Sequence, residues 1–95
     1  MFARIGTWHG TPEELERWII RSRDEVLPGV RQQPGIAAAY CFLDRQGGTG
    51  LTITIWESDE AMRASEQFRA GTQAGTSAAS GASVTTDRYE VIASL

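Results

Sequence analysis

Lysine and asparagine are absent from this chain of 95 residues, and its nine basic residues are all arginines. They are scattered among twelve acidic residues, which gives a formal net charge of −3. A protein that binds nucleic acid needs a basic patch or stripe to neutralise phosphates, and no such run is present. We therefore expect no nucleic-acid partner.

Cysteine and histidine each occur once, as Cys41 and His9. A single cysteine cannot form an internal disulfide, and one histidine with one cysteine cannot build a zinc or iron site of ordinary spacing. Neither GxGxxG nor GxxxxGK[ST] occurs, and the glycines of residues 47–50 suit a hairpin better than a phosphate-binding loop. The sequence predicts neither a metal site nor a cofactor.

Long apolar runs are also missing. The longest covers residues 36–43, which is too short to cross a bilayer, and the first residues lack the apolar stretch of a signal peptide. We therefore expect a cytoplasmic protein with no membrane segment. The length suits a single domain, residues 1–95, with a small core.

Alternating and helical patterns then divide the chain into six elements. Strands are predicted over residues 2–8, 36–43, 51–56 and 84–93, with a glycine-rich hairpin turn at 44–50. The first helix begins at Thr11, which forms a capping box with Glu14, and it kinks or ends near Leu27 because Pro28 follows. The second helix begins at residues 58–60. Residues 71–83 are either a frayed helix or a loop, and their weak packing would let them act as a mobile lid over a site.

The order β-α-β-β-α-β predicts an α+β, ferredoxin-like domain. Right-handed crossovers place both helices on one face of a four-stranded antiparallel sheet with strand order 4-1-3-2. In strand 51–56 we expect the aliphatic side chains to face the helices. Thr54 and Trp56 would then lie on the bare face, where a second subunit would cover them. The sequence therefore predicts a homodimer.

A short segment carries a family resemblance. Residues 53–65 read Ile-Thr-Ile-Trp-Glu-Ser-Asp-Glu-Ala-Met-Arg-Ala-Ser, and Pro34-Gly35 precedes the second strand. The Trp56-Glu57-Ser58 step with the acidic residue and alanine after it resembles the antibiotic biosynthesis monooxygenase family of the dimeric α/β barrel superfamily. This resemblance implies a homodimer with one ligand cleft per subunit between sheet and helices. Members include cofactor-independent monooxygenases of aromatic polyketides and haem-degrading enzymes.

The haem-degrading branch relies on an asparagine in the first strand and a histidine in the second helix. This chain has neither residue at those places, so we do not expect haem degradation. The leading interpretation is a small-molecule-binding protein that acts as a cofactor-independent monooxygenase on an aromatic, polyketide-like substrate. The alternative is a non-enzymatic ligand-binding or structural homodimer of the same fold.

Five residues are candidates for substrate binding, and no catalytic residue is identified. Trp56 and Tyr40 would position a flat aromatic molecule, although either also suits an interface. Arg88 would stabilise an anionic oxygen, or simply pair with a neighbouring acid. Met62 and Phe68 would rim a cavity of a few hundred Å³ beside a second helix rich in small residues. His9 is expected at the opposite end of the sheet from Trp56, as a surface residue.

Overall fold

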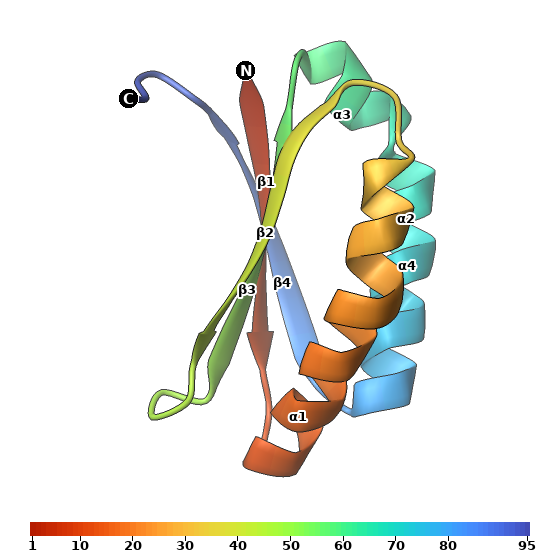
Figure 1. Cartoon of the computed structure of the whole chain (residues 1–95), viewed down its shortest axis with the longest axis vertical. Helices are drawn as coiled ribbons and strands as arrows, with labels where there is room; N and C mark the ends of the chain where they lie inside the picture. Colours follow the sequence, from red (N-terminus) through yellow and green to blue (C-terminus); the bar gives the residue numbers. More distant parts are fainter.

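A computed structural model describes all residues, 1–95, and confirms the ferredoxin-like α+β fold. The elements are β1 (Phe2–His9), α1 (Pro12–Arg21), η1 (Ser22–Val26), α2 (Leu27–Arg31), β2 (Ile36–Asp44), β3 (Thr49–Trp56), α3 (Asp59–Ala64), α4 (Glu66–Ser80) and β4 (Ser83–Glu90). All helices lie on one side of the sheet, and the other side is uncovered (Figure 1).

The sheet is antiparallel throughout and has the strand order β2-β3-β1-β4, as predicted. In the central pair, Phe2 lies opposite Trp56 and His9 lies opposite Thr49. Trp56 and His9 are therefore at opposite ends of the sheet, in agreement with the sequence.

The first helix starts with the predicted capping box, in which the Thr11 hydroxyl accepts a hydrogen bond from the Glu14 backbone N–H. Its regular part ends at Arg21, earlier than predicted. A π-helical segment, η1, follows, and α2 begins only at Leu27. The irregular segment places Pro28 in the first turn of α2. There the missing N–H of proline reduces helix stability least.

Residues 71–83 are mostly helical, because α4 continues to Ser80 and ends at Gly81 in the left-handed conformation. Of the two alternatives left open by the sequence, the helix is therefore the correct one for residues 71–80. Small residues let this helix lie close to α1. A Cβ atom on Gly75 would be 2.8 Å from the guanidinium of Arg21.

The two faces of β3 are the reverse of the prediction. Thr52, Thr54 and Trp56 face the helices, and Thr54 and Trp56 are buried. Leu51, Ile53 and Ile55 therefore point to the uncovered face, since successive residues of a strand alternate. Alternation shows that a segment is a strand, but it does not show which side the helices cover.

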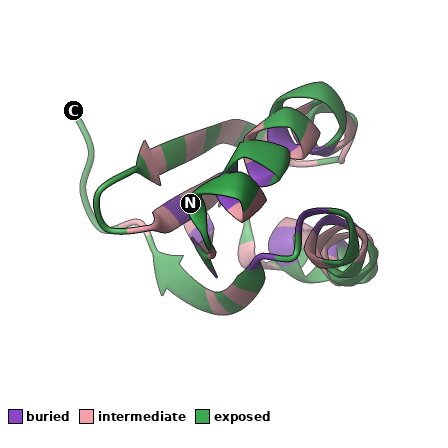
Figure 2. Cartoon of the chain, turned by 90° about the horizontal axis from the view of Figure 1, so that it is seen from below, coloured by how far each residue is buried: buried purple, intermediate pink, exposed green.

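The core lies between sheet and helices, where Figure 2 places the buried residues. Its centre is a cluster of Trp8, Leu15, Trp18 and Ala82. Glycine is required at position 50, because a Cβ there would lie 2.7 Å from the Trp18 ring. No helix of the chain combines the length and the apolar character needed to cross a membrane.

Candidate ligand-binding site

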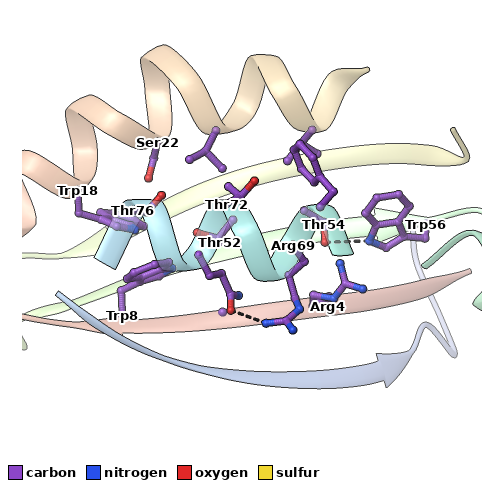
Figure 3. Close-up of a pocket in the computed structure, with 15 residues that line it drawn as sticks. Arg4, Trp8, Trp18, Ser22, Thr52, Thr54, Trp56, Arg69, Thr72 and Thr76 are labelled. Atoms are coloured by element: carbon purple, nitrogen blue, oxygen red, sulfur yellow. Dashed lines mark hydrogen bonds between the residues drawn. The ribbon is translucent and has the colours of Figure 1, made fainter. Parts of the chain in front are cut away.

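A cavity of about 50 Å³ lies between the helices and the helix-facing side of the sheet (Figure 3). β1 and β3 form its floor, and α1, η1, α2 and α4 form its roof. Its lining residues are Arg4, Gly6, Trp8, Trp18, Ser22, Val26, Val30, Thr52, Thr54, Trp56, Phe68, Arg69, Thr72, Gln73 and Thr76.

All three tryptophans of the chain line this cavity. Trp8 and Trp18 form one end, with ring centroids 6.3 Å apart and planes inclined by 42°. Trp56 lies at the other end, where its indole N–H donates to the Thr54 hydroxyl at 2.9 Å (Figure 3). The cavity therefore has aromatic walls at both ends.

Arg4 is the most buried charged residue of the site, with 5% of its surface exposed. Its guanidinium donates to the Ser65 hydroxyl at 3.1 Å, to the backbone carbonyl of Met62 at 2.8 Å and to Glu66 at 2.9 Å. Its Cζ atom lies 5.7 Å from the centroid of the Trp56 ring, within cation–π range. These contacts fix the cation at the edge of the cavity.

Glu66 is shared by three arginines. It forms ion pairs with Arg4 at 2.9 Å, Arg69 at 2.6 Å and Arg88 at 3.0 Å. Burial alone would raise the pKa of Glu66, but the hydrogen bonds from Arg69 and Arg88 and the charge of Arg4 outweigh it, so the pKa is lowered. One carboxylate cannot neutralise three guanidiniums, and the cluster keeps a positive charge beside the cavity.

This cluster predicts a loss of stability in acid. The folded-state pKa of Glu66 lies below its ordinary value of 4.5, so its stabilising contribution is fully present above pH 4.5 and is lost as the pH falls through the lowered value. We expect the difference in thermal midpoint between wild type and Glu66→Gln to be largest above pH 4.5 and to shrink towards zero as the pH falls below it. Thermal denaturation of both proteins at several pH values measures it. A difference that stays constant to low pH would contradict the prediction.

Five cavity residues carry a buried polar atom with no hydrogen-bond partner within the protein. They are Arg4 Nε, Trp8 Nε1, Trp18 Nε1, Arg69 Nε and Thr76 Oγ1. Four of these atoms are N–H donors, and no aspartate or glutamate lines the cavity. Unpaired buried donors each cost about 1–3 kcal/mol. The side chains around the cavity therefore offer hydrogen-bond donors and no carboxylate.

The structure brings two of the five predicted residues, Trp56 and Phe68, to the cavity. Met62 is buried beside it and contributes only its carbonyl, to Arg4. Arg88 pairs with Glu66 outside the lining. Tyr40 does not reach the site, because it lies on the uncovered face and stacks on Phe42 with centroids 5.9 Å apart.

Sequence reasoning missed four lining residues that carry much of the site's chemistry: Arg4, Trp8, Trp18 and Arg69. The signal for two of them was the alternation of Arg4, Gly6 and Trp8 along one face of the first strand. The cavity lies where it was expected, but its volume is well below a few hundred Å³. No group of three or more His, Cys, Asp or Glu side chains is placed to hold a metal ion.

No protein-family model matches the chain. It is 34% identical over 65 residues to the uncharacterized protein Rv2558 of Mycobacterium tuberculosis, a match that covers 68% of this chain and 28% of that protein. The chain thus spans less than a third of the length of this relative.

Solved structures match the whole chain. The monooxygenase ActVA-Orf6 of Streptomyces coelicolor, in complex with nanaomycin D, superposes with a TM-score of 0.79 at 16% identity, over 99% of this chain and 89% of that one. An antibiotic biosynthesis monooxygenase superposes with a TM-score of 0.72 at 22% identity, and the match covers 98% of this chain and 100% of that one. The heme-degrader MhuD of Mycobacterium tuberculosis, with two hemes bound in its active site, superposes with a TM-score of 0.70 at 22% identity. The match covers 100% of this chain and 99% of that one. This chain has the fold of the antibiotic biosynthesis monooxygenase-type proteins.

Proposed function

We propose that this protein binds a planar, oxygenated aromatic molecule in the cavity and oxidises it as a cofactor-independent monooxygenase. One observation carries the proposal: the cavity is lined by three tryptophans and two arginines and by no acidic side chain. Indole rings stack on flat aromatic ligands, and guanidinium groups bind oxygen acceptors.

The arginines favour an ionised oxygen on the ligand. Arg4 and Arg69 both line the cavity and both have an Nε–H without a partner. A guanidinium forms strong, charge-assisted hydrogen bonds with an oxyanion, and it lowers the pKa of a phenol or enol bound beside it. In this proposal these residues take the role first assigned to Arg88.

The lining contains no His, Asp, Glu, Cys or Tyr, and so no ordinary general base. A substrate that reacts here must ionise with the help of the arginines alone, which favours acidic phenols and enolisable ketones. Its carbanion or phenolate would then pass an electron to dioxygen. For an anthrone the reaction balances without a reductant: the ring CH₂ and O₂ give a carbonyl and one water.

The cavity must widen to hold such a molecule. Its 50 Å³ accommodates a few water molecules at about 10–15 Å³ each. The roof is the part that can yield, because Phe68 is only half-buried and its ring rests against Gly29, a contact without an opposing side chain. Rotation of this ring would open the roof between α2 and α4.

A second copy of the chain is the partner that the uncovered sheet face requires. That face carries Ile5, Tyr40, Phe42, Leu51, Ile53, Ile55 and Tyr89. Tyr40, Phe42 and Tyr89 are each at least half exposed. An apolar sheet face of this size on a small domain marks an interface. The proposal is a homodimer with the two sheets packed face to face.

The second candidate is a ligand-binding protein without catalysis, which the lack of a general base favours. Haem fits the site less well, because the lining contains no His, Cys, Met or Tyr to serve as an axial ligand.

Tryptophan fluorescence tests the proposal, because every tryptophan of the chain lines the cavity. Titration with 2-hydroxy-1,4-naphthoquinone, which is anionic at neutral pH, should quench the emission to saturation, with N-acetyltryptophanamide as the inner-filter control. An oxygen electrode with anthrone as substrate then separates enzyme from binder. Saturable quenching without oxygen uptake above the protein-free rate would favour the second candidate. Quenching no stronger than that of the control would refute both.

A further inference from the structure

Glu66 is the acidic partner that the two arginines of the cavity share. Its carboxylate pairs with Arg4 at 2.9 Å and with Arg69 at 2.6 Å, and neither guanidinium pairs with another acid. Glu66 is not among the residues that line the cavity. It therefore acts on a bound molecule through these two cations and not by direct contact.

Both guanidiniums lie beside side chains of the lining. Arg69 donates to the side-chain carbonyl of Gln73 at 2.7 Å (Figure 3). The Cζ atom of Arg4 lies 5.7 Å from the centroid of the Trp56 ring. Gln73 and Trp56 both line the cavity. An anion held by either guanidinium would therefore also be close to Glu66, which carries a charge of the same sign.

The carboxylate has two opposite effects on such an anion, because it anchors the guanidiniums and also repels the anion. The anchoring is partly duplicated: Arg4 also donates to the Ser65 hydroxyl and to the Met62 carbonyl, and Arg69 keeps its bond to the glutamine. The repulsion is strong where water screens charges poorly, and the 37% exposure of Glu66 reduces it without abolishing it. The repulsion should therefore outweigh the anchoring.

We infer that Glu66 is the internal counter-ion of the cavity and a specificity-determining residue, which weakens the binding of an ionised ligand relative to a neutral one of the same shape. The inference rests on the proposed function, because it assumes that an aromatic molecule binds beside Arg4 and Arg69. Its consequence is selection among anions. A small anion such as phosphate cannot offset the repulsion, whereas an aromatic anion offsets it by stacking on the tryptophans.

Two matched probes test the inference: 2-hydroxy-1,4-naphthoquinone is anionic at neutral pH, and 2-methoxy-1,4-naphthoquinone has the same rings and no charge. Both are titrated by tryptophan fluorescence, and the ratio of their dissociation constants gives the preference for the anion. Glu66→Gln keeps the shape of the side chain and removes the charge, whereas Glu66→Asp keeps the charge. Glu25→Gln is the matched control, because Glu25 pairs with Arg21 at 2.7 Å and neither residue lines the cavity.

We expect Glu66→Gln to raise the preference for the anion about threefold to tenfold, and Glu66→Asp and Glu25→Gln to change it by less than about twofold. The thermal midpoint of Glu66→Gln should fall at neutral pH, because three ion pairs lose their carboxylate. Affinity for the anion and stability would then change in opposite directions, which a purely structural role does not produce.

Wild type alone provides the test if Glu66→Gln does not fold. Naphthalene-2-sulfonate stays ionised in acid, and it should bind more tightly as the pH falls below 4.5 and Glu66, whose pKa is lowered by its arginines, becomes protonated. The charged groups that face Glu66 are Arg4 of β1, Arg69 of α4 and Arg88 of β4, and all three keep their charge in this range. Salt at about 0.3 M screens the more distant carboxylates. An affinity that does not rise would overturn the inference.

A preference for the anion that is unchanged or lower in Glu66→Gln would show that the carboxylate serves as an anchor, and an equal rise in Glu25→Gln would show an effect of net charge. Each result would overturn the inference while the proposed function stands, since the probes still bind. Failure of both naphthoquinones to bind wild type would overturn the proposed function and the inference together.

Discussion

Replacing Ile53 by glutamate is expected to convert the protein from a dimer into a folded monomer. Ile53 lies on the uncovered face in the middle of β3, between Ile5 and Tyr40 on the neighbouring strands. In the proposed dimer a glutamate here would be a buried, unpaired charge, which costs several kcal/mol. In a monomer it would face water and cost little. Light scattering should show the mass fall from twice 10.4 kDa to 10.4 kDa.

Ile20→Glu is the matched control, because Ile20 is an exposed isoleucine on α1. It introduces the same charge on the helical side of the molecule and should leave the mass unchanged. A wild-type protein that is monomeric at micromolar concentration would contradict the dimer directly. So would an Ile53→Glu protein that still runs at twice the chain mass.

Replacing Arg69 by methionine should weaken the binding of 2-hydroxy-1,4-naphthoquinone at neutral pH by about tenfold to a hundredfold. The expected loss is that of one hydrogen bond to a charged group, about 1.5–3 kcal/mol. Methionine keeps much of the side-chain length and apolar volume, so the walls of the cavity are largely preserved. Titration of the tryptophan fluorescence gives the dissociation constants.

Arg88→Met distinguishes this effect from a general change in charge. Arg88 pairs with the same Glu66 oxygen as Arg69, but it lies outside the cavity lining. Its loss should change the affinity by less than threefold. If both variants lose affinity equally, the Glu66 cluster acts through its total charge and Arg69 makes no direct contact with the ligand.

The sequence predicted correctly those structural features that depend on neighbouring residues. The capping box at Thr11 and Glu14, the glycine-rich hairpin and the alternation in β3 each depend on neighbouring residues, and each is present as predicted. The strand order followed from the handedness of the crossovers. The extent of α4 did not follow, because its Gly, Ser and Thr residues have weak helical preferences and packing against α1 decides the outcome.

The site was harder to predict, because it depends on which face of the sheet the helices cover. The usual expectation that the more apolar face points to the helices fails for β3, where the threonines line a cavity and the aliphatic residues lie on the uncovered face. Reversing that one assignment moves Trp56 into the cavity and leaves Tyr40 outside. The Arg4–Glu66 contact joins residues more than sixty positions apart, and no sequence spacing indicates it.

The π-helical segment controls the shape of the cavity roof through helical phase. Trp18, Ser22, Val26 and Val30 all line the cavity at steps of four residues. In a regular α-helix each such step overshoots a full turn by about 40°, so three steps would carry Val30 about 120° away from Trp18. The wider turn of η1, in which the Leu27 N–H reaches back to the Ser22 carbonyl, absorbs this drift. Inserting or deleting a single residue in this segment would therefore change which side chains point into the cavity, and so change which molecules fit there.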